Sequence, residues 1–171
     1  YQKEGFTNLI ATANSKQMER LSAIFEDLKK KSFQIQANNI PENEQCCMDI
    51  AQELEIDVPA HCLLPLKDHS LAYVVKRFDR KNGEKIHQED FCQILGAKDK
   101  YLGSVEQIGR KLREISSIPG LDVQLFFEMV VFSFLIGNGD AHLKNYSIYY
   151  PEGQIRLTPA YDIVCSRLVI H

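Results

Sequence analysis

The residues best suited to chemistry lie in the last third of the chain, between a glycine-containing turn at 137–139 and Asp162. Two carboxylates (Asp140 and Asp162), one carboxamide (Asn145) and one amine (Lys144) stand within this stretch. Carboxylate and amide oxygens are hard ligands, and they suit Mg²⁺ when phosphate oxygens and water complete its coordination shell. The residue types therefore favour metal-assisted chemistry on a phosphate-containing substrate.

A predicted helix and a predicted hairpin would position these side chains. An apolar run typical of a buried helix covers 122–137 and ends at Gly137, because glycine tolerates the positive φ of a helix end. Two strands are predicted at 146–150 and 154–158, joined by a short turn. Since a hairpin brings its two ends together, we expect Asn145 and Asp162 to lie side by side.

The spacing of the loop residues also resembles a known kinase family. Asp-x-x-x-x-Asn is the spacing of the catalytic loop of protein kinases, in which the Asp accepts a hydroxyl proton and the Asn binds metal. The run Gly-Asp-Ala-His-Leu-Lys-Asn-Tyr-Ser at 139–147, followed by Leu-Thr-Pro-Ala-Tyr-Asp-Ile at 157–163, resembles the signature of the HipA-like serine/threonine kinases. These are bacterial toxin kinases of toxin–antitoxin systems. Further landmarks in the same order lie at 41–44, 56–59, 74–80 and 87–93.

The resemblance implies an α+β, two-lobed kinase fold, with a small mixed N-lobe within 1–80 and a mainly helical C-lobe within 81–171. It implies ATP and Mg²⁺ as co-substrates and a protein hydroxyl as the acceptor. It further implies a target such as an aminoacyl-tRNA synthetase, whose phosphorylation blocks translation, and an antitoxin partner through which DNA is contacted only indirectly.

The resemblance also implies residue roles. The candidate catalytic base is Asp140, with His142 and Lys144 as loop supports or phosphate contacts, and Asn145 and Asp162 as Mg²⁺ ligands. The adenine would meet the backbone near Lys76, Arg77 and Phe78. Gln36 stands where the family has the lysine that grips the ATP phosphates, so this chain departs from the family pattern there.

The departure at Gln36 leaves alternatives open, because charge stabilisation is the main catalytic contribution in phosphoryl transfer. Another lysine, at 16 or within 29–31, could supply the charge, or residues could be missing from the sequence. The chain could also be a weakened kinase or a pseudokinase that binds nucleotide or a partner. A third hypothesis is a metal-dependent hydrolase built on Asp140, His142 and Asp162.

The remaining pattern predicts alternating helices and strands. Amphipathic spacing favours helices at 15–31 and from Pro41 onward, and a strand at 33–36. A hairpin is predicted from 61–66 and 71–78, and the charged stretch 79–83 is the candidate boundary between lobes. Helices are also predicted at 87–95 and 104–116, and four phenylalanines of the 122–137 helix are assigned to the core, at positions 126, 127, 132 and 134.

Composition excludes several classes of protein. The 171 residues are 44% hydrophobic and 25% charged, as in a globular domain rather than a disordered chain. A formal net charge of −3 argues against a dedicated nucleic-acid binder. The five cysteines show no C-x-x-C pair, which favours free thiols. No apolar run is long enough to span a membrane, so we expect a cytoplasmic protein; both ends suggest a fragment of a longer chain.

Overall fold

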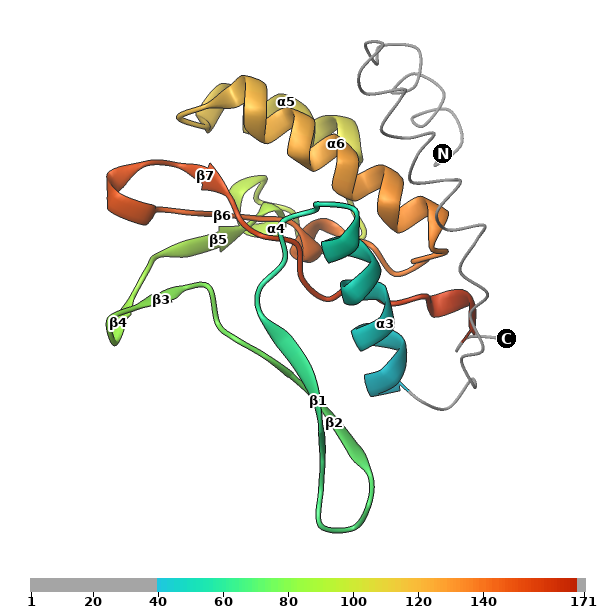
Figure 1. The fold of residues 1–171 in the computed structure, drawn as a ribbon. Helices are drawn as coiled ribbons and strands as arrows, with labels where there is room; N and C mark the ends of the chain where they lie inside the picture. Colours follow the sequence, from blue (N-terminus) through green and yellow to red (C-terminus); the bar gives the residue numbers. More distant parts are fainter. Residues whose placement is uncertain (1–39, 169–171) are drawn as a thin grey trace.

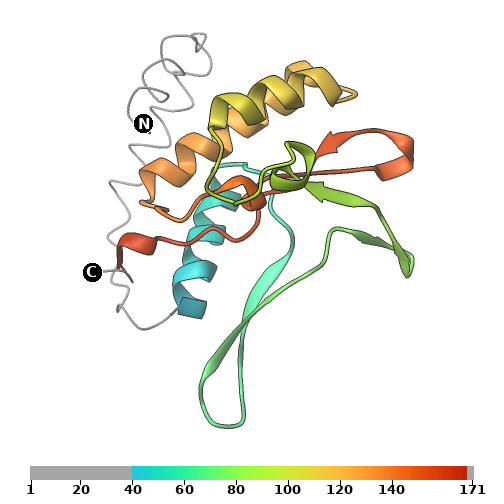
Figure 2. The ribbon, with the colours of Figure 1, turned by 180° about the vertical axis from the view of Figure 1, so that it is seen from behind.

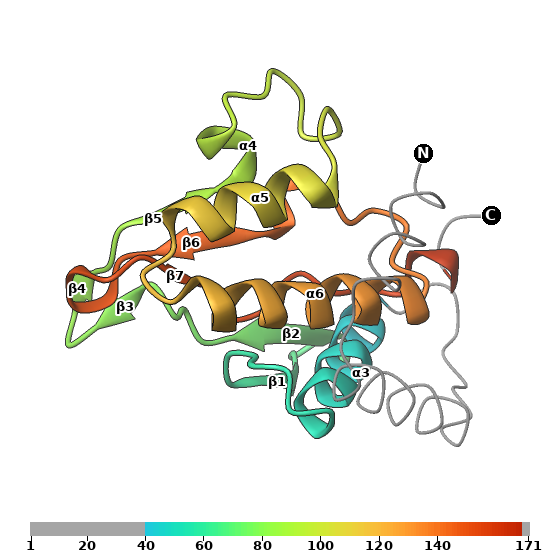
Figure 3. The ribbon, with the colours of Figure 1, turned by 90° about the horizontal axis from the view of Figure 1, so that it is seen from above.

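The computed structural model describes residues 40–168, so the predicted helix at 15–31, the predicted strand at 33–36 and Gln36 lie outside it. Helices and strands are mixed along the chain (Figure 1). The central layer is a three-stranded antiparallel sheet in the order β5–β6–β7, and helices α5 and α6 lie side by side across one face of it (Figure 3). This mixture agrees with the α+β class predicted from the sequence.

Helix α3 and a long hairpin form the first part of the described chain. The helix covers Ile40–Glu53, with Pro41 and Glu42 in its first turn, as predicted. It buries one face, made of Asn43, Cys47, Met48, Ile50 and Ala51. Strands β1 (His61–Pro65) and β2 (Leu71–Val75) then pair antiparallel beside α3, and their turn projects away from the rest of the molecule (Figures 1 and 2).

The charged stretch 79–83, the candidate boundary between lobes, forms part of a second hairpin. Strands β3 (Arg80–Lys81) and β4 (Glu84–Lys85) pair across Asn82 and Gly83, which both have positive φ. An Asn-Gly pair in this conformation is the preferred two-residue hairpin turn.

The helix predicted at 87–95 is wrong in its first half. Residues Gln88–Asp90 form strand β5, which pairs with β6, and only Phe91–Ile94 form helix α4. Asp90 ends the strand and begins the helix, because its carboxylate accepts the Gln93 N–H while the Gln93 side chain accepts the Asp90 N–H.

Helices α5 (Val105–Ile115) and α6 (Pro119–Leu135) match their predicted positions. Ser104 caps α5 through a reciprocal bond with Gln107, and Gly137, at φ +75°, follows the end of α6. Phe126, Phe127 and Phe132 are buried as predicted. Phe134 is 55% exposed, so its assignment to the core is wrong.

The predicted hairpin after α6 is present. A single 3-10 turn, η1 (Leu143–Asn145), leads into strand β6 (Ser147–Tyr149), the turn η2 (Pro151–Gly153) and strand β7 (Arg156–Leu157). A last 3-10 turn, η3, covers Ser166–Leu168. The segment after β7 returns to α3, where the Asn43 side chain bonds both the N–H and the carbonyl of Cys165. Within 40–168, no helix is long and apolar enough to cross a membrane.

Candidate functional site

Asn145 and Asp162 lie together, as the hairpin predicted. The Asn145 Nδ2 donates to Asp162 Oδ2 over 2.7 Å, although 17 positions separate them in the chain. Asn145 is 8% exposed and Asp162 is exposed, so the pair joins a buried carboxamide to a carboxylate at the surface. Asp162 has φ +55°, a conformation that non-glycine residues adopt rarely.

The turn before η1 is held by the C-terminal segment. The Ser166 hydroxyl accepts the Gly139 N–H at 2.6 Å and donates to the Gly137 carbonyl at 3.2 Å. The Asn145 Oδ1 accepts the His142 N–H at 2.9 Å, which closes the loop at its other end. Two separate anchors therefore fix the backbone on both sides of Asp140.

The Asp140 carboxylate is exposed and accepts a hydrogen bond from the Tyr101 hydroxyl at 2.8 Å. Tyr101 was not among the residues predicted for the site. Its partner lies 39 positions away, and neither residue belongs to a motif that would pair them. The sequence therefore carried no local signal for this contact.

Lys144 and His142 occupy different surroundings. Tyr161 donates its hydroxyl proton to the Lys144 carbonyl at 2.8 Å, so the Ser147 hydroxyl is the donor in its contact with Tyr161. Burial raises the pKa of Tyr161 to about 12, which keeps this donor neutral. The His142 ring packs edge-on against Tyr101, and its buried Nδ1 has no hydrogen-bond partner among residues 40–168.

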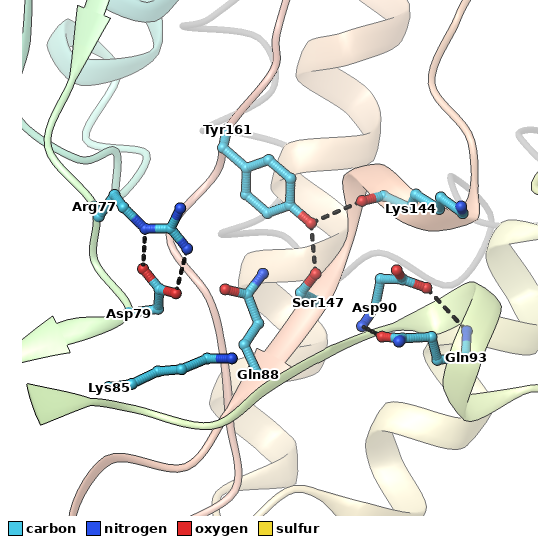
Figure 4. A pocket seen from close by; sticks show the side chains of 9 residues that line it. All are labelled: Arg77, Asp79, Lys85, Gln88, Asp90, Gln93, Lys144, Ser147 and Tyr161. Atoms are coloured by element: carbon cyan, nitrogen blue, oxygen red, sulfur yellow. Dashed lines mark hydrogen bonds and ion pairs between the residues drawn. The ribbon is translucent and has the colours of Figure 1, made fainter.

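A polar cavity of about 360 Å³ lies between the β3–β4 hairpin and η1 (Figure 4). Three cationic side chains, Arg77, Lys85 and Lys144, contribute to its wall, together with Ser147 and Tyr161. The other lining residues are Asp79, Gln88, Asp90 and Gln93. A second cavity, of about 480 Å³, shares Gln93 and Lys144 with the first and is also lined by the loop that carries Tyr101.

The predicted adenine-binding segment borders the first cavity. The Lys76 N–H donates to the Ala60 carbonyl, whereas the N–H groups of Arg77 and Phe78 make no backbone hydrogen bond within the part of the chain described. The Phe78 ring packs against those of Tyr149 and Tyr161, at 6.2 and 5.7 Å between centroids. This segment therefore offers two main-chain donors beside an aromatic surface.

Asp79, the residue after this segment, is buried and forms ion pairs with two arginines. It is 4% exposed and accepts two hydrogen bonds from Arg77, at 2.8 and 2.6 Å, and one from Arg80 at 2.6 Å. Hydrogen bonding by Arg77 lowers the pKa of Asp79 to about 2. The ion pairs link the predicted adenine segment to the β3–β4 hairpin.

Glu44 of α3 faces the same region as Asp162. Burial, and then the negative charge of Asp162, raise the pKa of Glu44 to about 7, against a smaller opposing effect of His61. The first turn of α3 therefore places a second carboxylate within electrostatic reach of Asp162.

The donor set fits a hard cation. Within 40–168, no hydrogen bond reaches Oδ1 of Asp162. The side-chain oxygen of Asn145, Oδ1, accepts the His142 N–H and has a second lone pair available for a cation. One carboxylate and one amide oxygen are what Mg²⁺ takes from a protein when phosphate oxygens supply the rest. Among residues 40–168 there is no cluster of three His, Cys, Asp or Glu side chains that could hold a metal ion.

Comparisons with known proteins show the family of the chain. The family model "HipA-like C-terminal domain" matches residues 15–171. "Putative kinase Y4dM" of Sinorhizobium fredii is 40% identical over 146 residues, covering 77% of this chain and 35% of that protein. The serine/threonine-protein kinase toxin HipA of Shewanella oneidensis is 33% identical over 115 residues, 54% of this chain and 27% of the toxin.

A solved structure is also similar. It is the complex of Shewanella oneidensis HipA with HipB and its operator DNA, matched with a TM-score of 0.63 and 28% identity over 76% of this chain and 35% of that chain. The present chain thus spans about a third of the length of these proteins.

Proposed function

Because the chain belongs to the family of HipA-like C-terminal domains, we propose that the protein transfers the γ-phosphate of ATP to a serine or threonine hydroxyl of another protein. Relatives named as kinases support this proposal at the level of the family. The observation that carries it is the contact between Asp162 and Asn145, because Asn145 lies in the same loop as Asp140.

In this proposal Asp140 is the catalytic base. Its exposed carboxylate takes the proton of the acceptor hydroxyl as the hydroxyl oxygen forms a bond to the γ-phosphorus. The bond between that phosphorus and the oxygen bridging to the β-phosphate breaks, and ADP leaves with the electron pair. Asp140 has the exposure that a bulky protein acceptor requires.

Asn145 and Asp162 would hold Mg²⁺, which neutralises charge on the phosphate oxygens when it is bound. Lys85 and Lys144 in the wall of the 360 Å³ cavity would favour negatively charged phosphates, whereas the charge of Arg77 is paired with Asp79. The free N–H groups of Arg77 and Phe78 would bind the adenine, with Lys76 as a neighbouring contact. His142 supports the loop through its backbone N–H.

We extend the proposal to the architecture and the partners. Helix α3 and the β1–β2 hairpin would belong to the smaller lobe, within residues 1–80, and residues 81–171 to the larger lobe. The solved relative is a complex with HipB and operator DNA. By analogy, an antitoxin would bind this protein, and the protein would contact DNA only indirectly, through that antitoxin. The substrate would be a translation enzyme such as an aminoacyl-tRNA synthetase.

The test uses the complete polypeptide that carries this chain, γ-labelled ATP, Mg²⁺ and a cell lysate. We expect one or more lysate proteins to be labelled. Replacing the base with Asp140→Asn, or a metal ligand with Asp162→Asn, should lower labelling by about 100-fold or more. The matched control is Asp68→Asn, which alters an exposed aspartate in the β1–β2 turn and should leave labelling unchanged. Full labelling by the Asp140 variant would refute the assignment of the base.

The alternative of a pseudokinase has a distinct result in the same experiment. A protein that binds nucleotide without transferring phosphate would be stabilised against heat by ATP with Mg²⁺, yet would label nothing. Gln36, where a lysine is expected, makes this outcome worth measuring alongside the labelling.

A further inference from the structure

The loop of residues 98–103, here called the tether segment, is attached to the loop that carries Asp140. The Leu143 N–H donates to the Lys100 carbonyl at 3.1 Å. Gly103 lies so close to Leu143 that a Cβ at position 103 would stand 2.6 Å from Leu143 Cδ2. A side chain at position 103 would therefore force Leu143 to shift, so a backbone hydrogen bond and close packing both connect the two loops.

Tyr101 lies at the middle of the tether segment and contacts the Asp140 loop twice. Its ring packs edge-on against His142, with 5.3 Å between centroids, and its hydroxyl donates to Asp140 Oδ1 at 2.8 Å. The Lys100 amine lies over the same ring, 4.9 Å from its centroid. The Tyr101 N–H is fixed in turn by the Asp99 carboxylate at 2.8 Å.

Burial does not explain why Tyr101 takes this position. The residue is 59% exposed, so little free energy is gained by removing its ring from water. Its contacts are instead directional, and they point to the Asp140 carboxylate. The exposed side chain of Asp140, next to Gly139, has rotational freedom, and a hydrogen bond from the Tyr101 hydroxyl removes part of it.

We propose that Tyr101 is a positioning residue for Asp140, holding one carboxylate oxygen so that the other faces the acceptor hydroxyl. This inference rests on the proposed function, in which Asp140 is the base. The Tyr101 hydroxyl donates to Oδ1 of Asp140. No hydrogen bond within 40–168 reaches Oδ2 of Asp140, so this oxygen remains available for the substrate. The tyrosine does not touch the reacting atoms in this arrangement; it acts through the aspartate.

Tyr101→Phe is the decisive variant, because it removes only the hydroxyl and retains the ring against His142 and Lys100. We expect kcat to fall by about tenfold, a part of the 10²–10⁴-fold that a base contributes, with KM for ATP unchanged. The melting temperature should not move. The control Tyr150→Phe removes a matching bond to a carboxylate, 2.6 Å to Glu89 Oε2, outside the site. It should leave kcat unaltered.

Other outcomes decide against the proposal. An unchanged kcat in Tyr101→Phe would show that the hydroxyl is incidental. A higher kcat with a lower KM for the protein acceptor would show that the hydroxyl obstructs the acceptor instead of orienting the base. A role in stability alone would lower the melting temperature and spare kcat.

A measurement without turnover separates this inference from the proposed function. If the native protein transfers no phosphate, the proposed function fails, and hydrogen exchange then tests the tether directly. Tyr101→Phe should speed amide exchange in residues 98–103 and 139–142 relative to the native protein and to Tyr150→Phe. Identical exchange in all three would refute the tether.

Discussion

Removing the Asp122 side chain should destabilise the fold without touching the candidate site. It is fully buried near the start of α6, where the carboxylate accepts bonds from the Ser116 hydroxyl at 2.6 Å and the Leu157 N–H at 3.1 Å. Arg156 completes the shell with Nη2 at 3.1 Å. One aspartate thereby joins the α5–α6 connection to strand β7.

Asp122→Ala should lower the free energy of unfolding by about 3 kcal/mol. The buried Leu157 N–H would lose its partner, which costs about 1–3 kcal/mol, and Arg156 would lose its counter-charge. Arg156 is 24% exposed on its side chain, so water can solvate part of the guanidinium and keep the total at the lower end of the 3–5 kcal/mol range for broken buried pairs.

Urea unfolding followed by far-ultraviolet circular dichroism measures this change, since the chain has no tryptophan to report by fluorescence. Asp68→Ala is the control, because Asp68 also accepts two hydrogen bonds, from Ser70, but is exposed. It should change stability by less than about 0.5 kcal/mol. A loss below about 1 kcal/mol in Asp122→Ala would refute the reasoning about burial.

Three further perturbations follow from the structure. Arg77 holds the pKa of Asp79 at about 2, below the ordinary value of 3.8. The ionised carboxylate therefore stabilises the fold fully above pH 3.8, and this stabilisation is lost as the pH falls through 2. In a plot of melting temperature against pH, Asp79→Asn should reduce the decrease in melting temperature over this range. For Glu44 the sign is opposite. Its folded pKa of about 7 exceeds the ordinary 4.5, so stability falls as the pH rises through this window, and Glu44→Gln should abolish the fall while Glu42→Gln retains it. At Asp162, the positive φ favours glycine, so calorimetry should show Asp162→Gly more stable than Asp162→Ala by about 1 kcal/mol; equal stabilities would argue against strain.

The sequence predicted those elements whose signals are local. Pro41 and Glu42 mark the start of α3, and Gly137 marks the end of α6, because caps and helix breakers act within a few residues. The β6–β7 hairpin was predictable for the same reason. Its closure alone sufficed to bring Asn145 and Asp162 together, so the central contact of the candidate site was foreseen.

Errors arose where a distant partner decides the structure. Residues Gln88–Asp90 form a strand because β6 pairs with them, and this pairing overrides their local preference for helix. The charges at 79–83 gave no sign that Asp79 is buried, because its burial depends on ion pairs with Arg77 and Arg80. Tyr101 was missed because its role depends on Asp140, which no spacing rule connects to it.

Two unfavourable contributions to stability meet at Asp162, a left-handed backbone conformation and electrostatic repulsion with Glu44. Its left-handed backbone is imposed by neighbours on both sides: Ala160 is fully buried with its N–H bonded to the Asp57 carbonyl, and Ile163 is 4% exposed. Its charge also opposes ionisation of Glu44. Strain of this kind persists only where the surrounding structure enforces it, and it concentrates at functional positions. A cation on the carboxylate would relieve the repulsion but not the strain, whereas glycine would relieve the strain and remove the ligand. No single change at position 162 would therefore remove both costs and keep the metal ligand proposed there.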